Sequence, residues 1–160
     1  MMKKLLSLIV LLTIFSSCEE DIKFNTPAVQ GIKDNELWKA IEYSARISNG
    51  NVLTIEADNG FETVVLRTSD YTPGSSYELG VDDINKATYS LEADGVSLQY
   101  QTGTGIGDGL IEISDKPGET NFEQGYISGT FRFNAVNSLN NTVNFQRGFF
   151  YKVPIVETTP

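Results

Sequence analysis

YISGTFRFNAV, residues 126–136, and VNFQRGFFYKV, residues 143–153, are the stretches that decide the fold of this chain. Apolar and polar residues alternate along both of them. Successive side chains of a β-strand project to opposite faces of the sheet, so the alternation predicts two strands that each have an apolar face and a polar face. Residues 137–142 are the expected connecting loop, which makes the two strands a hairpin.

The alternation also predicts which side chains share a face. On the first strand the apolar face carries Ile127, Phe131, Phe133 and Ala135, and the polar face carries Ser128, Thr130, Arg132 and Asn134. On the second strand the apolar face carries Val143, Phe145, Phe149, Tyr151 and Val153. Arg147 and Phe150 break the pattern, which indicates an edge, an end or a bulge.

Turn signals divide the preceding sequence into short segments rich in Thr, Val, Ile, Tyr and Phe. They are Asn49-Gly50, Asp58-Asn59-Gly60 and Asp94-Gly95. Asn-Gly and Asp-Gly pairs tolerate the positive φ that tight hairpin turns demand. We therefore predict an all-β domain, an antiparallel β-sandwich or partly closed barrel of about 8–10 strands.

Three segments need a separate interpretation. Residues 37–45 fit a helix, with Leu37, Trp38, Ile41 and Ala45 on one face, or a strand, with Leu37, Ile41, Tyr43, Ala45 and Ile47 on one face. We favour the strand, because Asn49-Gly50 then closes a hairpin. A helical turn is predicted at 82–85, capped by Asp82 or Asp83. The glycine-rich residues 102–109 are expected to form a flexible connection to a strand at 110–113, since a phosphate-binding loop would need a different motif.

The N-terminus carries the three parts of a secretory signal peptide. Lys3 and Lys4 precede an apolar run at 5–15, which is too short to span the roughly 30 Å hydrocarbon core of a bilayer. Phe15-Ser16-Ser17-Cys18 then resembles the lipobox of bacterial lipoproteins. The resemblance implies that Cys18, the single cysteine of the chain, is lipidated and becomes the first residue of the mature protein.

The predicted organisation is a lipoprotein signal peptide at 1–17, an acidic tether or linker at 18–32 and a single all-β domain at 33–160. Glu19, Glu20 and Asp21 resemble the export signal of Bacteroidota-type lipoproteins. This likeness implies an outer-membrane address with display at the cell surface, the periplasmic face being the alternative. A solvated tether also accounts for the three acidic residues.

Net charge narrows the class of partner. The chain has a formal charge of −9, and cleavage before Cys18 would make it more negative because both leader lysines are lost. Nucleic-acid affinity comes mainly from cationic side chains that release phosphate counterions, so no nucleic-acid partner is expected. The expected contacts are a membrane, through the lipid on Cys18, and a glycan or an envelope or host protein.

The absence of histidine removes several kinds of active site. The sequence has no Ser-His or Cys-His pair, no histidine-based zinc site and no cofactor motif. We therefore expect no enzyme, metal or cofactor, although Asp82 with Asp83, or Glu92 with Asp94, are carboxylate pairs that a hydrolase could use. Asp108 with nearby carbonyl groups is a weak calcium candidate. Six aromatic residues form a candidate sugar platform: Trp38, Tyr43, Tyr71, Tyr77, Tyr89 and Tyr100.

The C-terminal half resembles a family of uncharacterised Bacteroidota lipoproteins. The likeness rests on residues 127–135, ISGTFRFNA, on residues 142–150, TVNFQRGFF, and on Val153-Pro154-Ile155. Tyr77-Glu78-Leu79-Gly80, Ala87-Thr88-Tyr89 and the lipobox add to it. The resemblance implies an all-β domain on an outer-membrane lipoprotein, and it brings no catalytic or ligand-binding residue.

Three functions remain as hypotheses. The first is a lipid-anchored β-domain of the cell envelope that acts as a surface-exposed binding or structural module. The second is a carrier that holds an apolar ligand in a barrel cavity, which a solid core of Phe131, Phe133, Phe145 and Phe149 would exclude. The third is a hydrolase with paired carboxylates, which needs two acids converging in a concave site.

Overall fold

The computed structural model describes residues 26, 28–48 and 50–156, and this part of the chain contains strands and no helix. The predicted all-β class is therefore confirmed. Eleven strands follow in chain order: β1 (Ala28–Lys33), β2 (Glu36–Lys39), β3 (Glu42–Ser48), β4 (Val52–Asp58), β5 (Glu62–Thr68), β6 (Ser76–Leu79), β7 (Lys86–Ala93), β8 (Val96–Gln101), β9 (Asp108–Ile113), β10 (Tyr126–Val136) and β11 (Thr142–Pro154). No helix among the described residues is long and apolar enough to cross a membrane.

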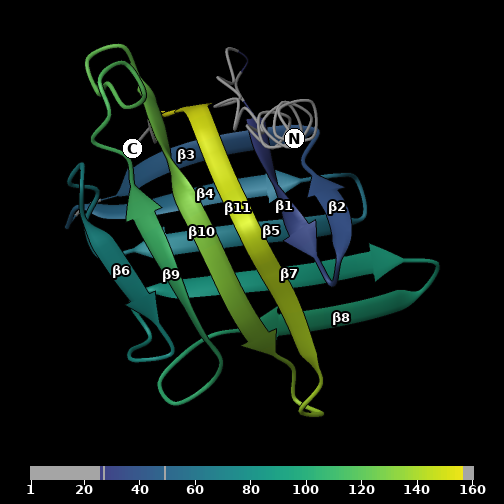
Figure 1. The fold of residues 1–160 in the computed structure, drawn as a ribbon. Helices are drawn as coiled ribbons and strands as arrows, with labels where there is room; N and C mark the ends of the chain where they lie inside the picture. Colours follow the sequence, from purple (N-terminus) through teal and green to yellow (C-terminus); the bar gives the residue numbers. More distant parts are fainter. Residues whose placement is uncertain (1–25, 27, 49, 157–160) are drawn as a thin grey trace, which may run out of the picture.

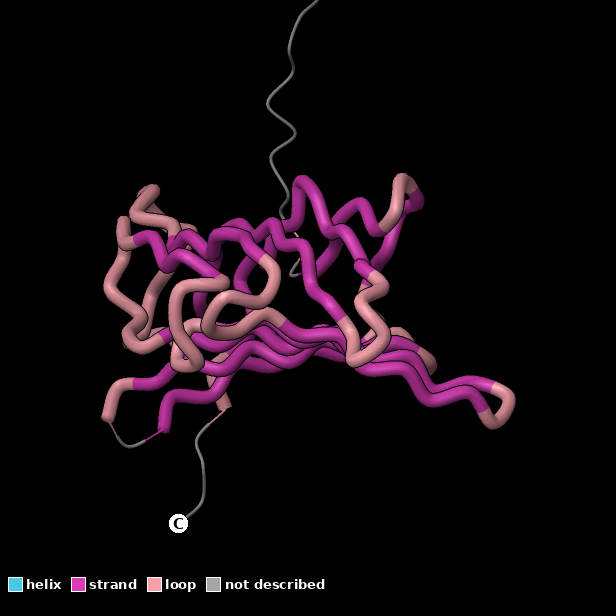
Figure 2. Tube along the Cα trace, turned by 90° about the horizontal axis from the view of Figure 1, so that it is seen from below, coloured by secondary structure: helices cyan, strands magenta, loops and turns pink. Residues whose placement is uncertain are grey.

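The strands form one antiparallel sheet that curls over on itself into two layers. The front sheet has the order β2-β1-β11-β10-β9-β6, and the rear sheet has the order β3-β4-β5-β7-β8 (Figure 1). The pair Val136–Gln101 joins β10 to β8 at one corner, and a bridge between Ala45 and Ile155 joins the layers at another. Figure 2 shows the two layers edge-on. The fold is thus a two-layered, partly closed barrel, within the predicted class of sandwich or partly closed barrel.

The β10–β11 hairpin has the predicted partners but not the predicted faces throughout. Phe133 pairs with Phe145, whereas Phe131 pairs with Gly148, so β11 holds one extra residue between these pairs. This β-bulge contains Arg147 with φ 50°. It reverses the alternation, so Phe150 is buried at 1 % exposure while Phe149, expected in the core, turns to the outer face.

A second bulge restores the first alternation near the end of β11. Gly129 pairs with Phe150 and Ile127 with Val153, which again leaves one extra residue on β11. Lys152, in this bulge, has φ 47°. Tyr151 lies between the two bulges and is half-buried on the outer face, not on the apolar face where we expected it. The sequence signal at Arg147 and Phe150 therefore marked a bulge and not a strand edge or end.

Two glycines, one beside each bulge, make room for aromatic rings across the hairpin. A Cβ atom at Gly129 would lie 2.4 Å from the ring of its partner Phe150, and one at Gly148 would lie 2.5 Å from the ring of its partner Phe131. Each ring therefore covers a glycine on the neighbouring strand. The Ser-Gly-Thr-Phe and Gly-Phe-Phe stretches of the sequence encode this reciprocal packing.

Ser128 is a second correction on β10, because it is buried instead of solvated. Residues 114–125 fold over this end of the strand, and Ser128 Oγ donates a hydrogen bond to the carbonyl of Glu119. Ser128 Oγ also accepts one from the N–H of Lys152, at 2.8 Å. The polar face was predicted from the strand alone, and the loop that covers it had no signal in the alternation.

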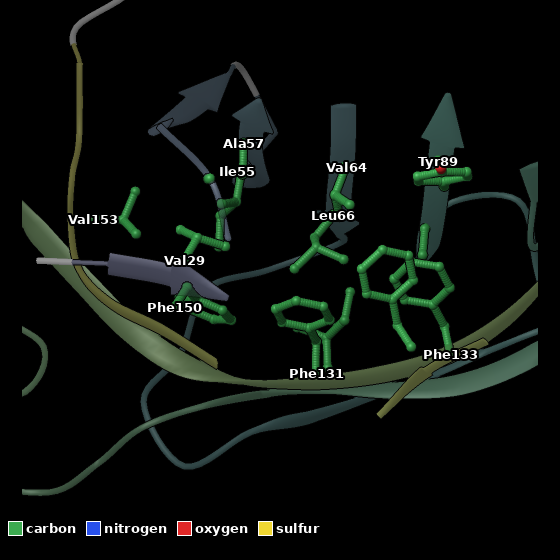
Figure 3. Close-up of a cluster of buried hydrophobic side chains, with 14 of the residues drawn as sticks. Val29, Ile55, Ala57, Val64, Leu66, Tyr89, Phe131, Phe133, Phe150 and Val153 are labelled. Carbon is green, nitrogen blue, oxygen red and sulfur yellow. The ribbon is translucent and has the colours of Figure 1, made fainter. Parts of the chain in front are cut away.

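The core fills the space between the layers with side chains from both sheets. Phe131, Phe133 and Phe150 project from the front sheet toward Ile55, Leu66 and Tyr89 of the rear sheet (Figure 3). The rings of Phe133 and Phe145 stack with centroids 4.7 Å apart, and Trp38 meets Phe145 edge-on at 5.7 Å. Burying large aromatic groups supplies much of the free energy of a small domain.

The domain begins earlier in the chain than the sequence suggested. Residues 28–32, which we assigned to the linker, form most of β1, and Val29 is fully buried. Gly31, which looked like a linker residue, lies where β1 runs close to β11: a Cβ there would lie 3.1 Å from the Cα of Gly148. Cys18, Glu19, Glu20 and Asp21 lie outside the described residues.

Residues 37–45 are extended, as we favoured, but they form two strands in different layers. The N–H of Ala40 bonds to Val29 in the front sheet, and the next N–H, of Ile41, bonds to Asp58 in the rear sheet. The chain therefore crosses between layers here and the alternation restarts. Trp38 is buried, whereas Leu37 and Ile41, expected on the buried face, are 69 % and 74 % exposed.

The predicted turns mostly hold. Asp94 and Gly95 close β7–β8 with φ of 49° and 81°. The other two signals lie between β3 and β4 and between β4 and β5, although Asn49 is outside the described residues. Residues 82–85 form bends and no helical turn, yet Asp82 accepts the N–H groups of Ile84 and Asn85 as a helix cap would.

Candidate functional site

The carboxylates considered for hydrolysis do not converge. Asp82 binds the backbone of its own bend, whereas Asp83 accepts a hydrogen bond of 2.9 Å from the hydroxyl of Thr104 in the β8–β9 connection. Backbone hydrogen bonds from Asn85 and Ile84 lower the pKa of Asp82, which is opposite to what a general acid requires. Glu92 and Asp94 are exposed on the β7–β8 hairpin.

Asp108 lies at the start of β9 and is hydrogen-bonded to the side-chain amide of Asn134, at 2.9 Å. The described residues contain no group of three or more Asp, Glu, His or Cys side chains placed to hold a metal ion. The glycine-rich connection that precedes Asp108 is folded back on itself through reciprocal hydrogen bonds between Gly103 and Ile106. This connection leads into β9, as the sequence predicted.

The six aromatic residues proposed as a sugar platform are mostly structural. Trp38, Tyr77 and Tyr89 are buried between the layers, and Tyr43, Tyr71 and Tyr100 are half-buried. Tyr89 packs against Phe145 and Tyr100 with centroid distances of 5.7 and 5.8 Å. These rings occupy the interior that a carrier would leave open for its ligand, so the observed packing argues against the carrier hypothesis.

A polar cluster that sequence reasoning missed joins the two sheets at one end of the interior. Lys33 of β1 forms an ion pair with Glu62 of β5 and a 3.1 Å hydrogen bond with the hydroxyl of Tyr89 on β7. Tyr89 donates to the same Glu62 oxygen, and Asn59 donates to the other at 2.7 Å. Because its members are distant in sequence, only the fold brings them together.

The pKa values in this cluster follow from burial and hydrogen bonding. Burial alone would raise the pKa of Glu62, but hydrogen bonds from Lys33, Tyr89 and Asn59 lower it overall. Burial would lower the pKa of Lys33, and its bonds to Glu62 and Tyr89 raise it. Burial and the bond to Glu62 raise the pKa of Tyr89 to about 12. The cluster is therefore a charged link between the two sheets. The lowered pKa of its carboxyl group does not suit acid catalysis.

The outer face of the front sheet holds the concave surface of interest. One hollow, of about 480 Å³, lies where β9, β10 and β11 meet the loop after β9, and a second, of about 370 Å³, adjoins it along the same strands. Glu112, Thr130 and Phe149 line both hollows, so the two form one continuous outer groove. Figure 1 shows these strands in front of the rear sheet.

The floor of the outer groove is a row of directly paired residues. Glu112 pairs with Thr130, and Thr130 pairs with Phe149 across β9, β10 and β11. The hydroxyl of Thr130 donates a 3.2 Å hydrogen bond to the carboxylate of Glu112. Tyr151 extends the aromatic surface beside Phe149, and Lys152 lies 5.5 Å from the Tyr151 ring centroid, within range of a cation–π contact.

Charge in the outer groove is balanced, unlike in the chain as a whole. Three acidic residues line it, Glu112, Asp115 and Glu119, and so do three basic ones, Lys116, Arg132 and Arg147. The groove thus offers carboxylates, cationic donors, hydroxyl groups and two aromatic rings without a dominant sign of charge. Such a surface is suited to a neutral ligand rich in hydrogen-bonding groups.

Sequence reasoning missed this groove because it placed Phe149 and Tyr151 in the core. The available signal was the broken alternation at Arg147. A bulge at Arg147 shifts the alternation by one residue. It thereby places both aromatic residues on the polar face of the hairpin, the face that carries Thr130 and Arg132 on the neighbouring strand. The loop residues Ser114 to Glu119, which form one wall, carry no comparable signal.

Comparison with known proteins gives one result. A family model described as a domain of unknown function (DUF6252) matches residues 25–154. No curated protein and no solved structure matches the chain. The chain belongs to the DUF6252 family, and the match begins just before β1 and ends with β11.

Proposed function

We propose that this DUF6252 protein is a lipid-anchored module of the cell envelope that binds a neutral glycan in its outer groove. The observation that carries the proposal is the groove itself, a concave surface of two adjoining hollows on the outer face of the front sheet. Aromatic rings pack against the apolar faces of sugar rings, while carboxylates and guanidinium groups bond sugar hydroxyls.

The composition of the groove favours a glycan over other ligands. Phe149 and Tyr151 supply aromatic surface, and Glu112 and Arg132 supply hydrogen-bonding groups on neighbouring strands. The balance of acidic and basic residues gives a nucleic acid no electrostatic advantage. Neither hollow is an enclosed cavity, which suits a chain of sugar units rather than a small enclosed molecule.

The lipid anchor is the second part of the proposal and rests on the sequence. The lipobox-like stretch before Cys18 and the acidic residues after it support attachment to the outer membrane with display at the cell surface. Between Cys18 and Ala28 the chain has room to span roughly 30 Å if extended. A tether of that length would let the domain stand clear of the lipid headgroups.

Glycan binding is tested by probing the full-length protein with an array of neutral polysaccharides and measuring affinity for the strongest binder by calorimetry. Phe149→Ala and Arg132→Ala should each weaken binding at least tenfold. Phe61→Ala is the matched control, because Phe61 is an exposed aromatic residue, 65 % accessible, and is absent from the groove. Equal affinity in all three variants would refute the groove as the site.

The anchor is tested in cells by metabolic labelling with a fatty-acid analogue. Label should enter the wild-type protein and should be absent from Cys18→Ala. Replacement of Glu19, Glu20 and Asp21 by alanine should protect the protein from protease added to intact cells. Unlabelled wild-type protein would contradict the anchor, and unchanged cleavage of the triple variant would contradict the export signal.

A further inference from the structure

The edges of the two sheets are protected unequally. An open strand edge presents unpaired backbone N–H and C=O groups, which natural proteins usually guard with charge, proline, short length or a covering segment. The front sheet ends in β2 and β6, which have four residues each and carry charged side chains. The β3 edge of the rear sheet contains Glu42 and Arg46, and Ile155 and Val156 bond along part of it.

Within the described part of the chain, the β8 edge has none of these protections. Its sequence, VSLQYQ, has no charged residue and no proline, although the chain as a whole has a charge of −9. On the side away from β7, the described residues pair with β8 only at Gln101, whose partner is Val136. Val96–Tyr100 is thus an open and uncharged edge. Figure 1 shows β8 as the outermost strand of the rear sheet, extending to the right beyond β10 and β11.

The direction of the backbone groups on β8 follows from its pairing with β7. The N–H of Thr102 bonds to the carbonyl of Ala87. Hydrogen-bonded residues alternate along an antiparallel pair, so Leu98 and Tyr100 also bond toward β7, whereas Ser97 and Gln99 direct their N–H and C=O groups to the open side. Gln101 does the same, consistent with its pairing to Val136.

We infer that the β8 edge pairs with the β8 edge of a second copy of this chain. A two-fold symmetric, antiparallel pair brings each residue opposite its equivalent or a near neighbour, so a charged strand would repel itself and an uncharged one does not. Val136 blocks Gln101, which confines the new pair to Val96–Tyr100 and centres it on Leu98. Ser97 then bonds with the partner copy's Gln99 in both directions.

The side chains of β8 suit this register. Val96, Leu98 and Tyr100 share one face, and Val96 is 49 % exposed. In the pair, Leu98 faces its own equivalent, and Val96 faces Tyr100. Cross-strand pairs of this kind, between aliphatic residues and between aliphatic and aromatic residues, stabilise a sheet. The two rear sheets would join into one continuous sheet.

Disulfide trapping in cells tests both the dimer and its register. Leu98 occupies a non-hydrogen-bonded position, where Cα atoms of facing residues lie about 4.5 Å apart, within the range that a disulfide spans. Full-length Leu98→Cys should give at least fivefold more reducible homodimer under mild oxidation than Gln99→Cys or the wild type. The wild type controls for any dimer formed through Cys18.

A charge substitution is the second test of the dimer. Leu98→Lys should abolish the dimer seen by native mass spectrometry of detergent-extracted full-length protein, since it places like charges opposite each other. Leu37→Lys, at the exposed face of the β2 edge, should leave the dimer intact. Equal trapping at Leu98 and Gln99, a trapped partner that is a different protein, or an undiminished Leu98→Lys dimer would overturn the inference.

Discussion

The inner and outer faces of the β10–β11 hairpin are made by the same two strands, yet one is a packed aromatic core and the other is an open groove. Phe150 is 1 % exposed and covers Gly129, whereas its neighbour Phe149 lines both hollows. The residue that separates these outcomes is the extra one in the bulge at Arg147. One inserted residue therefore decides which aromatic ring packs in the core and which lines the outer groove.

Adjacent phenylalanines give the largest expected contrast between the two faces. Phe150→Ala removes a ring from the core and leaves a cavity, so it should lower the free energy of unfolding by about 3–5 kcal/mol. Phe149→Ala removes a ring that is half-buried on the outer face, and it should cost about 1 kcal/mol or less. Urea denaturation followed by circular dichroism measures both. Equal losses would mean that the bulge does not separate the faces as the structure has it.

Gly129 and Gly148, which the rings of Phe150 and Phe131 cover, give the next largest effect. Gly129→Ala should lower the free energy of unfolding by about 3 kcal/mol, because the new methyl group would meet the carbonyl of Glu112 at 2.1 Å as well as the Phe150 ring. The same denaturation measurement applies.

Gly148→Ala should cost less, about 2 kcal/mol, since the Phe131 side chain that it meets can shift more readily than backbone. Thr130→Ala on the exposed face of the same hairpin is the control and should change stability by less than about 0.5 kcal/mol. If Gly129→Ala were as mild as this control, ring-over-glycine packing would not be what sets the inner face.

The Lys33–Glu62–Tyr89 cluster lies at one end of the inner face, and its contribution to the stability of that face should depend on pH. The pKa of Glu62 is lowered on folding, so its contribution is present above the ordinary value of 4.5 and is lost as pH falls through the folded value. The pKa values of Lys33 and Tyr89 are raised, so their contributions are complete below about pH 10 and are lost as pH rises further.

We therefore expect the wild type to lose stability in acid below about pH 4.5 and in alkali above about pH 10. Glu62→Gln should be less stable at neutral pH by about 1–3 kcal/mol, because Lys33 loses its charged partner, and its stability should fall less steeply in acid. Thermal unfolding across this range provides the measurement. A Glu62→Gln protein with the wild-type acid profile would show that other groups cause the acid loss.

The same comparison explains which parts of the fold and of the groove could be predicted from the sequence. Alternation located β10, β11 and their inward Phe131, Phe133 and Phe145, because a strand's side-chain period is local information. Alternation could not predict which residues face the core beyond the bulge at Arg147, because the extra residue is defined only by its pairing with the partner strand. Likewise, Lys33, Glu62 and Tyr89 come from three distant strands, and the crossing between layers at Ala40 and Ile41 reversed which residues are buried. Non-local pairing, absent from any single window of sequence, produced these three errors.

The smallest expected effect lies at the bulge itself. Arg147 has φ 50°, a conformation that costs a non-glycine residue about 1 kcal/mol and glycine almost nothing. Arg147→Gly should therefore keep the bulge and raise the free energy of unfolding by about 0.5 kcal/mol, the gain being reduced by the greater freedom of glycine in the unfolded chain. Gln146→Gly, its neighbour, has no positive φ to relieve and should lower stability by about 0.5–1 kcal/mol. If Arg147→Gly raises the free energy of unfolding and Gln146→Gly lowers it, the extra residue of β11 lies at Arg147. If both substitutions lower it, the residue that reverses the alternation between core and groove lies elsewhere on the strand.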